Sequence, residues 1–99
     1  MDENKFKLKK LSLKIIENIK EKGFLENKEP RTIAGLSLLL SCKLFKENID
    51  DKNKFYSKFS KKTALLNAYK EIKDNLKDII PENYADKLNL IQDNNNIFP

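Results

Sequence analysis

The sequence contains no histidine and only one cysteine, Cys42. These counts exclude a structural zinc site built by one chain, because such sites are made of several Cys and His ligands. They also exclude an intramolecular disulfide framework, which fits a reducing compartment. Nucleophile–base pairs are correspondingly scarce. We therefore expect neither an enzyme nor a protein that needs a cofactor or a metal.

Glycine and proline are also rare, with two and three residues among 99. A chain so poor in turn residues and rich in Leu, Lys, Ile and Glu is typical of an all-α fold with short connections. No apolar run reaches the roughly 18 residues of a membrane span. The lysine-rich N-terminus has no uninterrupted apolar core, so we expect no secretory signal and no membrane association.

Apolar residues recur at helical spacing over residues 4–22, and Gly23 is suited to end that helix. The next helix begins at Pro30, which is favoured in a first helical turn. Its apolar residues cover most of its circumference, so we expect it to be the buried central helix. Gly35 is one of its several small residues and predicts a close helix crossing. Cys42 lies on the same helix, and we expect a buried, unreactive thiol.

Two further helices are predicted over 52–58 and 61–78, with Asp50 or Asp51 capping the first and Ser60 the second. Phe55 and Phe59 should face inward from this first helix. An inward stripe on the longer helix is formed by Leu65, Tyr69, Ile72 and Leu76. A short helix, a tight turn and a longer helix are the outline of a helix-turn-helix unit.

Pro81 ends this helix or starts another one, and the polar stretch that follows, "QDNNN", indicates a mobile tail. We expect one domain over 1–93 and a polar tail over 94–99.

Charge is distributed unevenly along the chain. The net charge is +5, and residues 52–70 contain six lysines but no acidic residue. Such a concentration favours an anionic partner such as nucleic acid. The alternative is a lysine-rich solvated face without a partner.

In helix-turn-helix proteins the N-terminal residues of the second helix face the bases in the major groove. Lysines there would contact mainly phosphates, Asn67 could bond adenine, and Thr63 or Leu66 could touch a thymine methyl. Lysines of the preceding helix would flank the groove. The candidate DNA-binding residues are Lys58, Lys61, Lys62, Thr63, Leu66, Asn67 and Lys70.

Three segments resemble the cyclin-like repeats of transcription factor IIB and its archaeal counterpart. "KEPRTIAGLSLLLS" is similar to the central-helix motif K-S-P-x-x-I-A-A-A-A-L-Y-x-A, and "NAYKEI" to the recognition-helix core N-x-Y-K-E-L. "IIPENYADKL" resembles the "FP…VDKL" stretch that follows in the second repeat. The three motifs stand in the family's order, and the resemblance covers about residues 8 to 90.

This resemblance implies a cyclin-like bundle of four to five helices in a general transcription initiation factor. The implied partners are promoter DNA, the TATA-binding protein and, through the rest of the protein, the RNA polymerase II machinery. It further implies a nuclear location, or a cytoplasmic one if the protein is archaeal. If the resemblance holds for the recognition helix, Thr63 and Leu66 occupy the positions of the family's base-contacting side chains.

The chain departs from the family pattern in two respects. Leu66 stands where the family commonly has arginine, a guanine reader, so we expect an AT-rich or non-specific contact. The helix before residues 4–22 is missing, as is the first repeat, so we expect a fragment that self-associates through its uncovered surface. Two alternatives are a protein-binding helical module without DNA contact and the related factor of RNA polymerase III.

Overall fold

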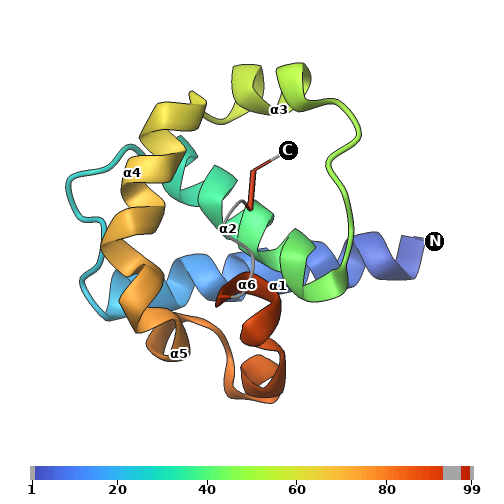
Figure 1. Ribbon diagram of the computed structural model, residues 1–99, viewed down its shortest axis with the longest axis vertical. Coiled ribbons are helices and arrows are strands. Elements are labelled where there is room, and N and C mark those ends of the chain that lie inside the picture. The colour runs from blue at the N-terminus through green and yellow to red at the C-terminus, as the bar shows by residue number, and fades with distance from the viewer. Residues whose placement is uncertain (1, 93–96, 99) are drawn as a thin grey trace.

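The computed structural model describes residues 2–92 and 97–98, and these residues form helices without any β-strand (Figure 1). The all-α fold predicted from the sequence is therefore confirmed. The elements in chain order are α1 (Asp2–Glu21), α2 (Pro30–Phe45), α3 (Lys52–Lys58), α4 (Lys62–Ile72), the 3₁₀ turn η1 (Lys73–Asn75), α5 (Leu76–Ile79), the 3₁₀ helix η2 (Glu82–Lys87) and α6 (Asn89–Gln92).

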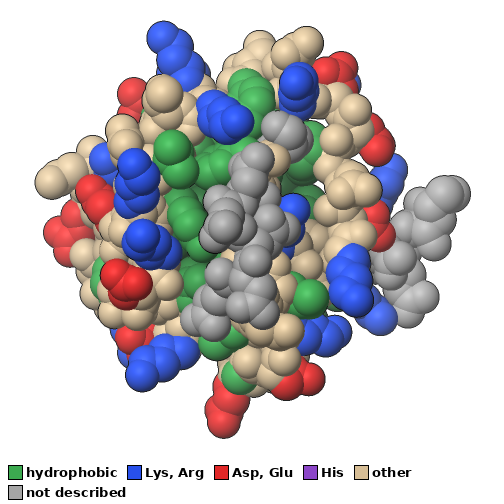
Figure 2. Space-filling view, in the orientation of Figure 1, with side chains coloured by type: hydrophobic (Ala, Val, Ile, Leu, Met, Phe, Trp, Pro, Cys, Tyr) green, Lys and Arg blue, Asp and Glu red, His purple; other side chains and the backbone are tan. Residues whose placement is uncertain are grey.

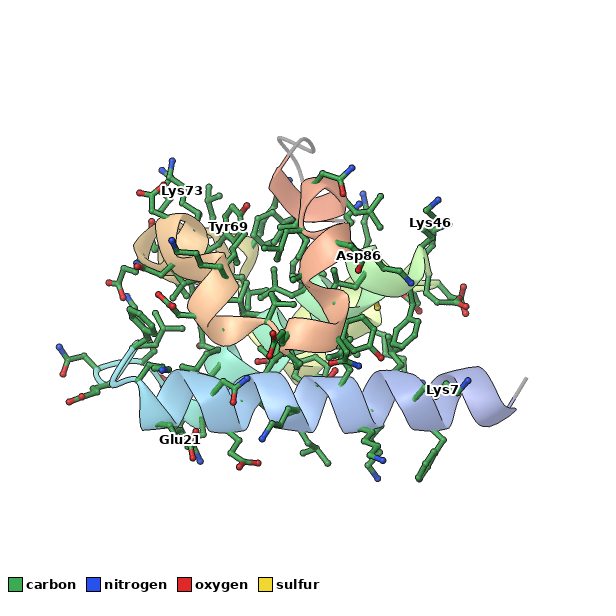
Figure 3. The ribbon with its side chains drawn as sticks, turned by 90° about the horizontal axis from the view of Figure 1, so that it is seen from below. Lys7, Glu21, Lys46, Tyr69, Lys73 and Asp86 are labelled. Atoms are coloured by element: carbon green, nitrogen blue, oxygen red, sulfur yellow. The ribbon has the colours of Figure 1, made fainter. Side chains whose placement is uncertain are left out.

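Helix α1 lies along one side of the molecule, and α2 and α5 pack on its inner face. Figure 3 shows this arrangement, with Lys7 and Glu21 marking the two ends of α1. Tyr69 of α4 lies above the Glu21 end, and Lys46 lies towards the Lys7 end. The inner face of α1 buries Leu11, Ile15 and Ile19.

The end of α1 is formed as the sequence predicts. Gly23 has φ +74°, in the left-handed region that favours glycine,. The Gly23 N–H donates to the Lys20 carbonyl at 3.2 Å, and the Phe24 N–H donates to the Ile19 carbonyl at 3.0 Å. This hydrogen-bond pair is the Schellman motif, which satisfies the last carbonyls of a helix.

Helix α2 is the central helix, as its apolar sequence predicts. It contacts α1, α4 and α6 and lies in the middle of the ribbon in Figure 1. Leu36, Leu39, Leu40 and Leu44 are almost completely buried. The Ser41 hydroxyl accepts from Ser12 on α1 and donates to the Ser37 carbonyl, whereas the buried Ser37 hydroxyl has no partner among the described residues.

Gly35 allows α2 to pass close beneath the connection between α3 and α4. A Cβ atom at Gly35 would lie 2.7 Å from Cβ of Phe59 and 3.2 Å from Cδ2 of Leu65. Ordinary carbon–carbon contacts are about 3.5–4.0 Å. The close crossing predicted from Gly35 is therefore confirmed, and it positions the two helices that carry the predicted DNA-binding residues.

The end of α2 uses a lysine where glycine would be preferred. Lys46 has φ 57° and ψ 35°, and the Glu47 N–H donates to the Cys42 carbonyl at 2.8 Å. A residue with a side chain in the left-handed region costs roughly 1–2 kcal/mol. Glycine avoids this cost, but its greater freedom in the unfolded chain offsets part of the gain. We predict that Lys46→Gly raises the free energy of unfolding by about 1 kcal/mol, measured by urea denaturation. A lowered urea midpoint would contradict this explanation of the helix end.

The two predicted caps of α3 and α4 have different outcomes. Asp51 caps α3, because its Oδ1 accepts from the Lys54 N–H at 3.1 Å. The prediction that Ser60 caps α4 is wrong, since the N-cap residue is Lys61 and no side chain bonds the helix end. The Ser60 hydroxyl instead accepts from Thr32 Oγ1 at 3.1 Å, which ties the α3–α4 turn to the start of α2.

The helix predicted over 61–78 is interrupted in the structure. Helix α4 ends at Ile72, and the 3₁₀ turn η1 precedes the short helix α5. The inward stripe is confirmed for Leu65, Ile72 and Leu76, which are fully buried, whereas Tyr69 is half-buried. Burial, with a smaller contribution from the Asp74 carboxylate, raises the pKa of the Tyr69 phenol.

Of the predicted polar tail over 94–99, the structure describes Ile97 and Phe98. Residues 94–96 and 99 lie outside the described residues. Ile97 and Phe98 are 3% and 7% exposed and belong to the core. The prediction is wrong for these two residues, because their apolar side chains fill space beside Leu39 and Cys42 of α2.

Candidate nucleic-acid interface

The predicted DNA-binding residues are brought together at the end of α3 and along α4. The exposed ones are Lys58, Lys61, Lys62, Thr63, Asn67 and Lys70. Leu66 is half-buried and packs against the core, so only part of it can touch a base. Figure 2 shows lysine side chains over the region of α3 and along α4, with acidic side chains towards the lower end of α4.

The N-terminal end of α4 faces solvent. No side chain caps it, and its first turn contains no acidic residue. The first intrahelical bond of this end is the one from the Leu65 N–H to the Lys61 carbonyl, at 3.1 Å. The preceding N–H groups are therefore left for an external acceptor, and the helix dipole makes this end favourable for an anion.

The positive charges of the lysines on this surface are not neutralised by carboxylates of the described residues. In the described part of the chain, none of Lys58, Lys61, Lys62 and Lys70 forms an ion pair. Glu71 is the acidic residue on α4, and it reaches Lys28 at 3.6 Å. The Lys58 ammonium lies 5.6 Å from the Phe59 ring centroid, which limits its freedom without neutralising it,.

Thr63, Asn67 and Lys70 stand at spacings of four and three residues, so they share one exposed face of α4,. Their side chains combine a hydroxyl, an amide and a cation. An amide can bond a base edge and a cation can bond a phosphate, whereas none of the three is a strong nucleophile. The arrangement is suited to binding.

Sequence reasoning missed the contribution of distant segments to this surface. Lys28 and Arg31, from the start of α2 and the loop before it, line a cleft together with Tyr56, Lys61 and Asn67. The start of α2 approaches α4 only because α2 crosses beneath the α3–α4 turn. No local pattern in the sequence indicates that approach, although Gly35 predicts a close crossing of some kind.

Cys42 lies near the C-terminal end of α2 and is 5% exposed. Burial, with the Glu47 carboxylate adding to it, raises the pKa of the Cys42 thiol to about 11. At pH 8 this shift lowers the thiolate fraction on the order of 100-fold relative to a free cysteine.

We therefore predict that Cys42 in the folded protein reacts with iodoacetamide at pH 8 on the order of 100-fold more slowly than in urea-unfolded protein. Rates are measured by intact-mass spectrometry at matched reagent concentration. Equal rates in the two states would show that the thiol is accessible and ionised in the folded protein.

Neither a cluster of metal ligands nor a membrane-spanning helix is found among the described residues. They contain no group of three or more His, Cys, Asp or Glu side chains placed to hold a metal ion. None of the helices described for residues 2–92 combines the length and apolar character needed to cross a membrane.

Comparison with known proteins adds no functional assignment to this geometry. No family model matches the chain, and searches of curated proteins and of solved structures find no match.

Proposed function

We propose that this chain is a promoter-DNA-binding domain of a transcription factor IIB type, in which α3 and α4 act as a helix-turn-helix and α4 enters the major groove. One observation carries the proposal: the end of α4 is exposed, uncapped by any side chain and surrounded by lysines that have no ionic partner in the described part of the chain. Such a surface matches the phosphate backbone, which supplies most of the affinity of a DNA-binding protein.

Burial supports the division of roles within α4. Leu65, Ala68 and Ile72 are fully buried against the core, so this face cannot contact DNA. The opposite face carries Thr63 and Asn67, which would lie along base edges while the lysines hold the backbone. The half-buried Leu66 supplies apolar contact and no guanine-specific bonds. We propose an AT-rich or non-specific site.

The resemblance to the second cyclin-like repeat of the IIB family supports the same proposal from different residues. Its central-helix motif falls on α2, and its recognition-helix core, residues 67–72, falls on α4. On this basis the proposed partners are the TATA-binding protein and the polymerase II machinery, in the nucleus or, for an archaeal protein, in the cytoplasm.

A second function, protein binding without DNA contact, is favoured by apolar surface on another side of the molecule. Phe6 and Leu13 on α1 are 66% and 57% exposed. A separate groove of about 580 Å³ is lined partly by apolar residues, Leu8 and Phe55 among them, and partly by charged residues such as Glu47. Self-association through this surface is part of this second proposal.

A gel shift on a TATA-containing duplex, with and without the TATA-binding protein, tests which function holds. We predict a shifted band with the domain alone at low salt and a further shift when the TATA-binding protein is present. A shift only in the presence of the TATA-binding protein, insensitive to changes at Lys61 and Lys62, would favour the protein-binding function.

A further inference from the structure

A cleft of about 580 Å³ lies beside the proposed DNA-binding face, between the start of α2, α3 and the start of α4. Its lining includes the cations Lys28, Arg31 and Lys61 and one carboxylate, Glu29. Arg31 Nε donates to Glu29 at 2.9 Å, and Lys28 lies 3.6 Å from Glu71. Lys61 has no ionic partner among the described residues, so the cleft keeps a net positive charge when both ion pairs are counted.

Hydroxyl groups in the cleft have unused donor capacity. Thr32 Oγ1 donates to Ser60 Oγ at 3.1 Å, and this pair uses one of its two protons. The Tyr56 hydroxyl is buried and has no hydrogen-bond partner among the described residues. Burial raises the pKa of the Tyr56 phenol, which keeps the hydroxyl protonated and able to donate,. A buried polar group without a partner is destabilising, and a water or a ligand oxygen can supply the missing partner.

Helix α4 adds backbone donors at the same place. Ala64 lines the cleft and belongs to the first turn of α4, whose N–H groups have no side-chain acceptor. Cations, hydroxyl donors and a helix N-terminus thus converge from three segments of the chain. A singly charged phosphodiester, whose oxygens only accept hydrogen bonds, is the group in DNA that matches this set.

We infer that this cleft binds one phosphodiester of the DNA backbone, with Lys61 neutralising it and with Arg31 and the Tyr56 hydroxyl donating to it. Arg31 remains paired with Glu29. The inference rests on the proposed DNA-binding function and deepens it. Asn67 also lines the cleft, so a phosphate held here fixes the position of the α4 face that reads the bases,.

The Tyr56→Phe variant tests the hydroxyl donor, with Tyr84→Phe, a half-buried tyrosine on η2, as the matched control. We expect Tyr56→Phe to weaken duplex binding about tenfold, because it removes one hydrogen bond to a charged group. We expect its urea midpoint to be unchanged or higher, because the hydroxyl has no partner in the free protein. Wild-type affinity in this variant, or a lower urea midpoint, overturns the inference.

The Arg31→Gln variant tests the charge, with Lys20→Gln on the last turn of α1 as the control. Losing one phosphate contact should reduce the slope of log affinity against log salt by about one, whereas the control should keep the wild-type slope. If the slope for Arg31→Gln is unchanged while the wild-type protein still binds duplex, the inference that the cleft binds a phosphodiester is overturned. The proposed DNA-binding function is left standing. Failure of the wild-type protein to bind duplex at all overturns both.

Discussion

Replacing Lys61 and Lys62 together by glutamate should weaken binding to duplex DNA on the order of 100-fold at 0.1 M salt or below. Both side chains are exposed at the start of α4 and have no ionic partner among the described residues. The change removes two phosphate contacts and places two carboxylates against the backbone. Juxtaposed like charges cost several kcal/mol, and each 1.4 kcal/mol corresponds to about tenfold in affinity.

A matched control separates this local effect from the change in net charge. Lys9 and Lys10 are also adjacent and exposed, but they lie on α1. Lys9→Glu together with Lys10→Glu changes the net charge equally and should reduce affinity much less. Fluorescence anisotropy with one labelled duplex compares the two variants. Equal losses would show that total charge, and not the end of α4, governs binding.

Gly35→Ala should lower the free energy of unfolding by about 2 kcal/mol, although alanine is the better helix former by up to about 1 kcal/mol. The new methyl carbon would lie 2.7 Å from Cβ of Phe59, an atom that rotation of the phenyl ring cannot move away. The backbone of the α3–α4 turn must therefore shift. We expect DNA binding to weaken with it, because that turn positions Lys61.

The neighbouring Ala34 provides the control for helix propensity. It is half-buried on the same helix, and Ala34→Gly should also lower stability, by up to about 1 kcal/mol,. Urea denaturation of both variants distinguishes the two causes. If Gly35→Ala stabilises the protein while Ala34→Gly destabilises it, propensity dominates and the close crossing is not a constraint.

Much of the fold follows from local patterns in the sequence. The near-continuous apolar character of α2 predicts its central position, and Gly23 and Asp51 form the helix ends that their residue types predict. These predictions succeed because periodicity and capping depend on neighbouring residues. The wrong predictions depend on tertiary contacts, since Ser60 bonds Thr32 of α2 instead of capping α4, and Ile97 and Phe98 fill part of the core.

Some residues of the candidate site can likewise be identified from local sequence, whereas others depend on tertiary packing. The acid-free lysine segment and the exposed face of α4 can be identified from the sequence, because both are local. Arg31 cannot, because it joins Lys61 only through the packing of α2 against the α3–α4 turn. Half-burial of Leu66 is another tertiary effect, and it weakens the expected contact with a thymine methyl.

The salt dependence of duplex binding by the wild-type protein tests the central claim most directly. Four lysines at α3 and α4 have no ionic partner within residues 2–92 and 97–98. If each contacts one phosphate, a plot of log affinity against log salt concentration is linear with a slope of about −3 to −4. Anisotropy titrations between 50 and 200 mM salt, a range over which such slopes are readily resolved, would measure it. A slope near zero, or no binding at the lowest salt, would contradict the claim that this surface holds the DNA backbone.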